Sequence, residues 1–301
     1  MTDIQRIHVD RDPFGKDVPR IEGIHSFYKW PAQWIAPEGA CPYEPCVFAA
    51  SLKVDIEQHA TVRLHVSADQ IFECYLDGEF VGRGPERSDV DHWMFASFQA
   101  ELEPGEHVLS ARVVYAADEA GAAQMTARPG FLCAAEGQWG DAFNTGEAPW
   151  RVKVLEGYEF RRAPRLWLAM PRVHVDTGAS AGDWRDTQTA GWEEPAVGRK
   201  GTVRGHSDTA PGPVLRPSML PAMRRDRVPA GRVRHAAKSP KDVVVRPEES
   251  APELAAAAQA ILDGESPLTV PPRSRWRVLV DSEAYRCAYE RFRVAGGKGA
   301  K

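Results

Sequence analysis

The chain has 301 residues, 43% of them hydrophobic and 27% charged, which is the composition of an ordinary globular protein with a sizeable core. Its 38 basic and 42 acidic residues give a formal net charge of -4, and so mild a balance argues against nucleic acid or an anionic membrane as a partner. The first residues are charged, and no stretch approaches the ~20 apolar residues of a membrane helix. We therefore expect a cytoplasmic chain without a signal peptide or a membrane span.

Cysteine and histidine form no pattern typical of a metal site. The nine histidines occur singly, apart from His174 near Asp176, whereas a metal needs three or four converging ligands. We expect no metal and no cofactor. The cysteines are odd in number and scattered, which favours reduced structural thiols over a disulfide framework. They are Cys41, Cys46, Cys74, Cys133 and Cys287.

Residues 1–40 are predicted to form an irregular N-terminal segment, because the segment is rich in proline and lacks periodicity. Trp30 and Trp34 lie near its end. Large indole rings are costly to leave in water. We therefore expect this segment to pack onto a core.

Residues 41–175 are predicted to form a β-sandwich domain. Val62, Leu64 and Val66 alternate with polar residues and should share one face of a strand. Asp77-Gly78 separates two short apolar runs, which is a strong indication of a hairpin. Short strands separated by Gly and Pro favour a mainly β fold, an antiparallel sandwich of jelly-roll or galactose-binding-like type, over an α/β fold.

Periodicity is weak after this domain. Residues 176–250 are rich in Gly, Pro, Arg and Asp and are predicted to be a long irregular connection, which either wraps around the domain or is partly disordered. Residues 251–264 favour a helix, since they are rich in alanine and end at Gly264. Residues 265–301 are expected to be the start of a second, truncated β domain.

A succession of motifs resembles the N-terminal β-domain region of bacterial α-L-rhamnosidase-like glycoside hydrolases of family 78. The motifs are "PAQWIAP", "YLDGEFVGRGPERSD", "LEPGEHVLSARVVY", "NTGEAPWRV", "AGWEEPAVG", "LRPSMLPAM" and "VLVDSEAYRCAYERFRVAGGKGAK". Their order over most of the chain, rather than any single motif, carries the resemblance. Gly146 stands where the sugar-binding version of the family has an aspartate.

The resemblance implies a non-catalytic role for this chain. The family places its catalytic carboxylates in a helical barrel that follows the β domains, and no part of the sequence up to Lys301 has that pattern. Inverting hydrolysis needs an acid and a base roughly 6.5–9.5 Å apart. We expect an accessory β-sandwich portion that packs on a separate catalytic domain or chain and contacts a rhamnose-containing carbohydrate. The alternative is a free-standing carbohydrate-binding module.

The stretch Phe72–Asp89 is interpreted as the corner of a sheet rather than a reactive loop. Asp77-Gly78 allows the positive φ angles of a tight turn, and Pro85 ends the strand ladder. In this interpretation, Arg83 and Arg87 are available to contact a sugar or a neighbouring domain.

A third hypothesis is a serine hydrolase that uses Ser180. "GASAG" at 178–182 matches the G-x-S-x-G elbow, but the elbow needs a helix behind the serine, and "DWRDTQTAGW" starts a helix poorly. His206 lies in a Gly-rich segment with no reason to meet the serine. Coincidence is the preferred interpretation.

Carboxylates are densest near Trp184 and Trp192, where Asp183 is the first of four. We interpret them as a solvated loop rather than an acid–base pair. No residue of this chain is expected to be catalytic or to bind a metal. The residues expected to contact carbohydrate are Arg83, Arg87, Trp150, Asp183 and Trp184.

Overall fold

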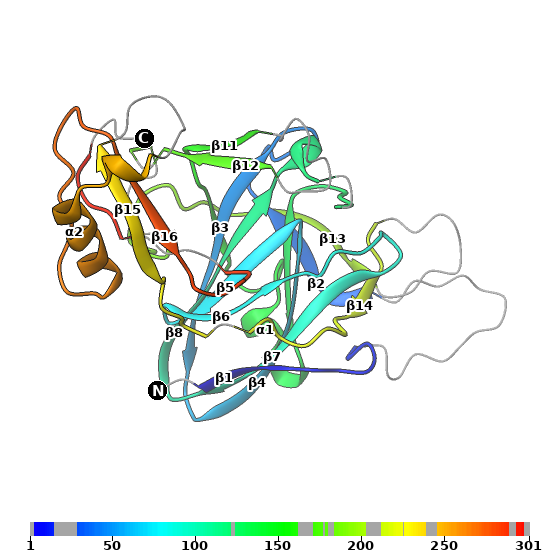
Figure 1. Ribbon diagram of the computed structural model, residues 1–301. Helices are drawn as coiled ribbons and strands as arrows, with labels where there is room; N and C mark the ends of the chain where they lie inside the picture. Colours follow the sequence, from blue (N-terminus) through cyan, green and yellow to red (C-terminus); the bar gives the residue numbers. More distant parts are fainter. Residues whose placement is uncertain are drawn as a thin grey trace. The chain divides into compact units, whose positions relative to one another are not determined.

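The chain divides into two compact units, Met1–Ala222 and Met223–Lys301 (Figure 1). No described helix is long and apolar enough to cross a membrane. The structure is a computed structural model that describes residues 3–14, 29–121, 124–161, 171–176, 178–179, 184–202, 212–224, 226–238, 246–288 and 293–297.

The larger unit is built from two facing sheets. The first has the order β1-β7-β4-β9-β2-β13, with β14 pairing parallel to β7. Its strands are β1 (Asp3–Ile7), β2 (Lys29–Ala36), β4 (Ala60–Asp69), β7 (Trp93–Leu102), β9 (Gly130–Ala135), β13 (Ala196–Thr202) and β14 (Leu215–Pro217).

The second sheet has the order β10-β3-β8-β5-β6, and all its pairs are antiparallel. Its strands are β3 (Cys46–Ile56), β5 (Ile71–Leu76), β6 (Glu79–Gly84), β8 (Gly105–Tyr115) and β10 (Arg151–Val154). The prediction of a mainly β fold with an antiparallel sandwich is confirmed.

The sandwich core lies between the sheets and follows the alternation of the strands. Val62, Leu64 and Val66 of β4 share this core, as their spacing predicts. From the opposite sheet, Phe72 and Phe48 fill it with rings that are fully buried. Each strand therefore sends every second side chain into one common layer and leaves the rest for the outer faces.

Apolar clusters also cover the outer face of each sheet. On the seven-stranded sheet, Trp30 packs with Phe95 and Leu132, which confirms that the N-terminal tryptophan packs onto a core. On the five-stranded sheet, Leu155 packs with Val47 and Ala49 of β3. The sandwich is thus shielded on parts of both outer faces as well as filled inside.

Short elements connect the sheets of the larger unit. β11 and β12 pair with each other as a separate two-stranded sheet. The short elements are η1 (Ala117–Glu119), η2 (Gly137–Trp139), α1 (Gly140–Phe143), β11 (Tyr158–Arg161) and β12 (Arg172–Val175).

The smaller unit packs one helix against a two-stranded sheet. Antiparallel β15 (Arg232–Lys238) and β16 (Trp276–Asp281) are joined by η3 (Pro247–Glu249) and α2 (Pro252–Leu262). The helix begins at a proline, which suits the first helical position, and its Ala258 is buried. The Gln259 side chain accepts a hydrogen bond of 2.8 Å from the Val233 amide, which ties α2 to β15.

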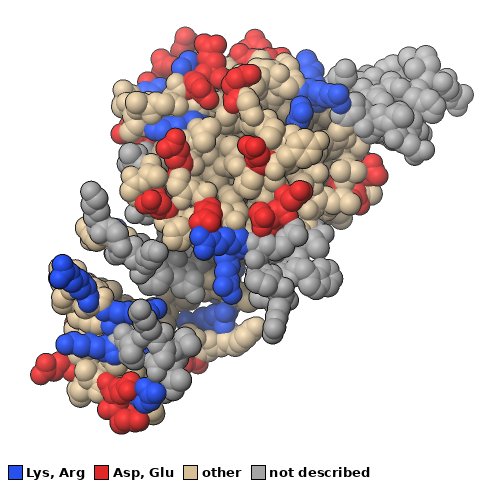
Figure 2. Space-filling view, turned by 90° about the horizontal axis from the view of Figure 1, so that it is seen from above, with Lys and Arg blue, Asp and Glu red and all other residues tan. Residues whose placement is uncertain are grey.

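The two units differ in charge. Residues 1–222 contain 22 Lys and Arg against 32 Asp and Glu, whereas residues 223–301 contain 16 against 10. Figure 2 shows acidic side chains spread over the visible face of the larger unit and basic ones prominent on the smaller unit. The mild charge of the whole chain therefore hides an acidic unit and a basic one.

Gly82 of β6 tests the packing of the sandwich. A Cβ at this position would lie 2.6 Å from Cε1 of Phe98, a ring held in the core. We expect Gly82→Ala to lower the free energy of unfolding by about 1–3 kcal/mol, the usual cost of overpacking. Urea unfolding of the purified chain measures the change.

The control is Phe98→Leu, which removes the atoms that clash. The double variant should be less destabilised than the sum of the single variants, because each change then relieves the other. Unchanged stability of Gly82→Ala would mean that β6 does not lie over Phe98.

Candidate functional site

The β5–β6 hairpin is held in place by its turn. Asp77 and Gly78 have φ angles of 51° and 80°, which is the left-handed conformation a two-residue hairpin turn requires. The Asp77 carboxylate accepts hydrogen bonds from the Val108 amide at 2.8 Å and from Nδ1 of His107 at 2.7 Å. The turn that the sequence predicts is thereby fixed to β8.

This arrangement favours the charged form of the His107 ring. Its Nε2 donates to the Glu103 carbonyl at 2.7 Å, so both ring nitrogens face acceptors. Burial opposes the charged ring, but the Glu103 carbonyl and the Asp77 carboxylate outweigh burial and raise the pKa of His107.

A carboxylate between two guanidinium groups marks the outer face of the five-stranded sheet. Glu73 of β5 is paired with Arg83 on β6 and with Arg112 on β8. Its side chain lies 2.7 Å from Nη2 of Arg112 and 4.0 Å from Nη2 of Arg83. All three side chains are no more than 30% exposed, so these charges interact more strongly than a surface pair would.

An aromatic group adjoins these charges. Tyr75, two residues along β5, contacts the rings of Phe80 and Trp184 edge-on, each at a centroid distance of 5.5 Å. The Arg185 guanidinium lies 5.4 Å from the Tyr75 ring centre, within cation–π range. The Tyr75 hydroxyl approaches Glu73 at 3.4 Å, and burial followed by the Glu73 charge raises the pKa of Tyr75.

We call Glu73, Tyr75, Arg83, Arg112 and Trp184 the outer-face cluster. It combines half-buried aromatic rings with fixed guanidinium donors and one carboxylate acceptor. Burial disfavours the charged form of Arg112, but the Glu73 carboxylate prevails and raises the pKa of Arg112. The cluster can therefore offer ring faces and hydrogen bonds to a polar ligand, but it presents no acid–base pair facing across a cleft.

Two of the five sequence-predicted residues fall in this cluster. Arg83 and Trp184 belong to it, whereas Arg87 lies beyond β6 and is exposed. Trp150 is 2% exposed in the sandwich core, where its Nε1 donates to the Phe143 carbonyl at 2.9 Å. Asp183 lies outside the described residues. Carbohydrate contact by these residues stays a prediction.

Sequence reasoning missed the other three members, Glu73, Tyr75 and Arg112. The alternation of "IFECYL" was the available indication, because it places Glu73 and Tyr75 opposite to Phe72, Cys74 and Leu76. Arg112 could not be paired with Glu73 without the order of the strands. Ser180 and His206 both lie outside the described residues, so the hydrolase hypothesis stays a prediction.

A second polar group lies on the outer face of the seven-stranded sheet. Nδ1 of His65 is 2.8 Å from the Ser97 hydroxyl, and its Nε2 is 3.1 Å from the Glu136 carboxylate. The order serine, histidine, carboxylate matches that of a relay for nucleophilic catalysis. However, His65 is 0% and Ser97 4% exposed, so neither can reach a substrate from solvent.

Aromatic rings enclose His65. Burial lowers the pKa of His65 to about 4, although the Glu136 carboxylate acts in the opposite direction. The ring is therefore neutral, accepts from Ser97 at Nδ1 and donates to Glu136 at Nε2. The rings that meet it edge-on at 5.5–6.0 Å are those of Phe14, Trp30 and Phe95.

A buried carboxylate ends β4. Asp69 is 1% exposed and accepts hydrogen bonds from the Thr126 hydroxyl and from the amides of Ala127 and Arg128, at 2.6–2.9 Å. Burial raises the pKa of Asp69 to about 6 despite these three donors. Among the described residues, no group of three or more His, Cys, Asp or Glu side chains could hold a metal.

No protein-family model and no curated protein matches the chain. Among solved structures, it is similar to a GH78 family rhamnosidase of Bacillus sp. GL1 at 20% identity and a TM-score of 0.57, over 70% of this chain and 22% of that chain. An α-L-rhamnosidase from Dictyoglumus thermophilum matches at 14% identity and a TM-score of 0.45, over 70% of this chain and 24% of that chain. A lectin from Pleurotus ostreatus matches at 12% identity and a TM-score of 0.35, over 56% and 42%.

These comparisons establish the fold alone. The two lower TM-scores identify no shared fold, whereas the Bacillus structure contains a portion folded like the 70% of this chain that the match covers. The chain covers less than a quarter of the length of either rhamnosidase.

Acidification should destabilise the larger unit through His65. The folded-state pKa of about 4 lies below the usual 6.5, so the unfolded chain binds the proton first, and stability is lost as the pH falls from 6.5 towards 4. At ~1.4 kcal/mol per pKa unit, the loss is on the order of 3 kcal/mol. Urea unfolding at a series of pH values measures it.

His65→Gln serves as the control, because glutamine keeps hydrogen-bonding capacity but cannot take up the proton. Asp69 changes stability with pH in the opposite direction to His65. Its folded-state pKa of about 6 lies above the usual 3.8, so the folded chain holds the proton more tightly, and this stabilisation is lost as the pH rises from 3.8 to about 6. The comparison is therefore made in an Asp69→Asn background as well. Equal pH dependence with and without His65 would contradict the assignment.

Proposed function

We propose that this chain is a non-catalytic accessory β-sandwich portion of an α-L-rhamnosidase-like glycoside hydrolase, whose outer-face cluster contacts carbohydrate. The fold of the Bacillus rhamnosidase portion supports the proposal, as does the ordered succession of motifs in the sequence. A neighbour named as a rhamnosidase fits a carbohydrate-related β domain.

The observation that carries the proposal is the composition of the outer-face cluster. A sugar ring has an apolar face of C–H groups and an edge of hydroxyl groups. Tyr75 and Trp184 supply aromatic surface for the former, and Arg83 and Glu73 supply a donor and an acceptor for the latter. A rhamnose-containing oligosaccharide is the ligand we propose.

Packing on a catalytic domain or chain is the second part of the proposal. Met219 and Leu220, which follow β14, are 82% and 60% exposed. Two adjacent exposed apolar side chains give another protein body an apolar surface to cover. Their place just after the strand that pairs with β7 gives such a body a rigid support.

A free-standing carbohydrate-binding module is the alternative. It is favoured by the fact that all members of the outer-face cluster belong to the larger unit, so the surface needs no partner to form. The hydrolase built on Ser180 stays a prediction, and its test is labelling of the chain by a fluorophosphonate probe.

Binding is tested by titrating the chain with a rhamnose-containing oligosaccharide, followed by calorimetry and tryptophan fluorescence. Trp184→Ala should weaken binding by up to about tenfold, since an aromatic contact contributes ~0.5–1.5 kcal/mol. Arg83→Met should weaken binding more than Trp184→Ala does, because the hydrogen bonds from the guanidinium group to the sugar are lost.

Trp139→Ala is the matched control, because Trp139 is also half-buried but lies in η2, outside the cluster. Binding that is absent in the unmodified chain, or equally weakened by Trp139→Ala, would overturn the proposed site. The non-catalytic part is checked on p-nitrophenyl α-L-rhamnoside. Turnover that a carboxylate substitution within this chain abolishes would contradict it.

A further inference from the structure

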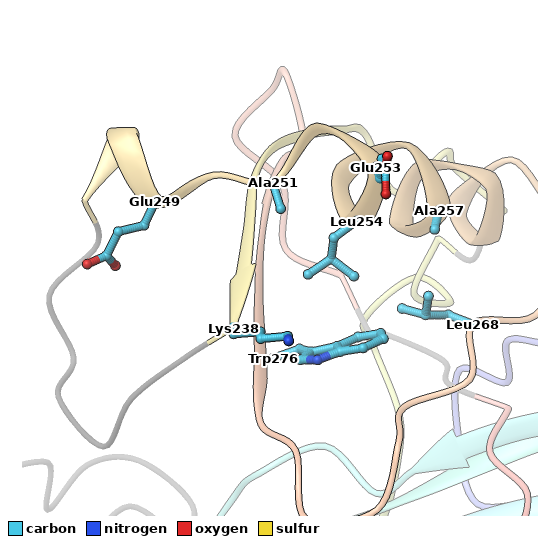
Figure 3. Close-up of a pocket in the computed structure, with 8 residues that line it drawn as sticks. All are labelled: Lys238, Glu249, Ala251, Glu253, Leu254, Ala257, Leu268 and Trp276. Carbon is cyan, nitrogen blue, oxygen red and sulfur yellow. The ribbon is translucent and has the colours of Figure 1, made fainter.

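The smaller unit contains a pocket of about 570 Å³ between α2 and the two-stranded sheet of β15 and β16 (Figure 3). Trp276 of β16 forms its floor, and Leu254 of α2 and Leu268 form apolar walls. This volume lies within the ~300–1,000 Å³ range of sites for small ligands. An indole floor between aliphatic walls suits a flat ring with an apolar face.

Two hydrogen-bond donors meet at the floor, and neither has an acceptor among the residues that the structure describes. Nε1 of Trp276 is buried and has no hydrogen-bond partner within the described part of the chain. Lys238 is the register partner of Trp276 on the neighbouring strand and lies beside its indole nitrogen in Figure 3. An ammonium group only donates, so Lys238 cannot satisfy the indole N–H. Lys238 itself forms no ion pair with a described residue.

One carboxylate acceptor, that of Glu253, lies on the helical side of the pocket. Glu253, in the first turn of α2, lines it and pairs with no cation among the described residues. Glu249 instead pairs with Arg246 at 3.2 Å, and its carboxylate points away from the floor in Figure 3. The pocket therefore offers donors at one side and a carboxylate acceptor at the other.

We propose that this pocket binds an acidic sugar, a single uronic acid residue free or within a chain. The sugar ring stacks on Trp276, and its carboxylate accepts from the Lys238 ammonium and from the indole N–H once the flexible lysine moves aside. A sugar hydroxyl donates to Glu253. This site is separate from the outer-face cluster and does not depend on the function proposed for it.

Charge and chemistry exclude simpler occupants. A neutral sugar leaves Lys238 and the indole N–H without a strong acceptor. A plain aromatic acid carries a carboxylate for Lys238 but has no hydroxyl group that could donate to Glu253. This unit has 16 basic and 10 acidic residues, and its net positive charge also attracts an anionic ligand from a distance.

The test uses the full chain labelled with ¹⁵N, in which each tryptophan gives an indole N–H resonance. The resonance missing from Trp276→Phe identifies Trp276. Titration with methyl β-D-glucuronide should shift this resonance downfield, because the N–H gains an acceptor. Methyl β-D-glucoside and benzoate should bind at least tenfold more weakly.

Variants then separate the groups. Lys238→Met should weaken glucuronide binding about tenfold or more, since charge-assisted hydrogen bonds are the strong ones. Trp276→Phe keeps the stacking face but loses the N–H, and should weaken binding about threefold to tenfold. Arg275→Met is the matched control: it removes the same charge from an exposed residue that does not line the pocket, and should leave binding unchanged.

Three results would overturn the proposal: an unmoved Trp276 resonance, equal binding of glucoside and glucuronide, or equal binding of benzoate. An effect of Arg275→Met as large as that of Lys238→Met would also do so, because it would reveal a non-specific attraction of anions. Trp184→Ala should not alter glucuronide binding, so failure of either site can be recognised independently of the other.

Discussion

Strand β5 lies between β6 and β8, and its side chains must alternate between the sandwich core and the outer face. Phe72, Cys74 and Leu76 enter the core, so Glu73 and Tyr75 point outward. A slip of one residue would bury the Glu73 charge and expose a fully buried ring, which the apolar core does not allow. The core thereby sets the register, and the register brings Glu73 opposite a guanidinium on each neighbouring strand.

The outer faces of the sandwich are not uniform solvent-exposed surfaces. One carries the outer-face cluster, in which the half-buried Glu73 carboxylate lies between two guanidinium groups. The other carries His65, which is kept neutral by burial and hydrogen-bonded at both nitrogens. Polar groups in such places remain stable only when their partners are fixed, so each cluster depends on the strands beneath it.

Much of the sandwich follows from local sequence. The alternation of β4 and the Asp77-Gly78 turn fix a strand and a hairpin without reference to the rest of the chain. His65 illustrates the limit: alternation places it on the outer face, but only the fold shows that Trp30 and Phe14 cover that face. The pairing of Glu73 with Arg112 cannot be predicted from local sequence either. β5 and β8 are neighbours in the sheet, but β6 and β7 lie between them in the sequence.

The candidate site is less accessible to sequence reasoning than the fold. Arg83 and Trp184 could be chosen by residue type, but Trp150 looks the same in sequence and is a core residue. Whether an indole is buried depends on which sheet covers it, and no local pattern records that. The Trp276 pocket was missed for the same reason, since Lys238 meets Trp276 only through the pairing of β15 with β16.

The most direct test of this account is a double-mutant cycle on Glu73→Ala and Arg112→Ala, read out as the free energy of unfolding. The half-buried pair, 2.7 Å apart, should show a coupling energy of about 1–2 kcal/mol, more than a surface pair gives. The exposed pair Lys53 and Glu106, 3.3 Å apart, serves as the reference and should show almost none. A Glu73–Arg112 coupling no larger than that reference would contradict the register of β5 and the cluster built on it.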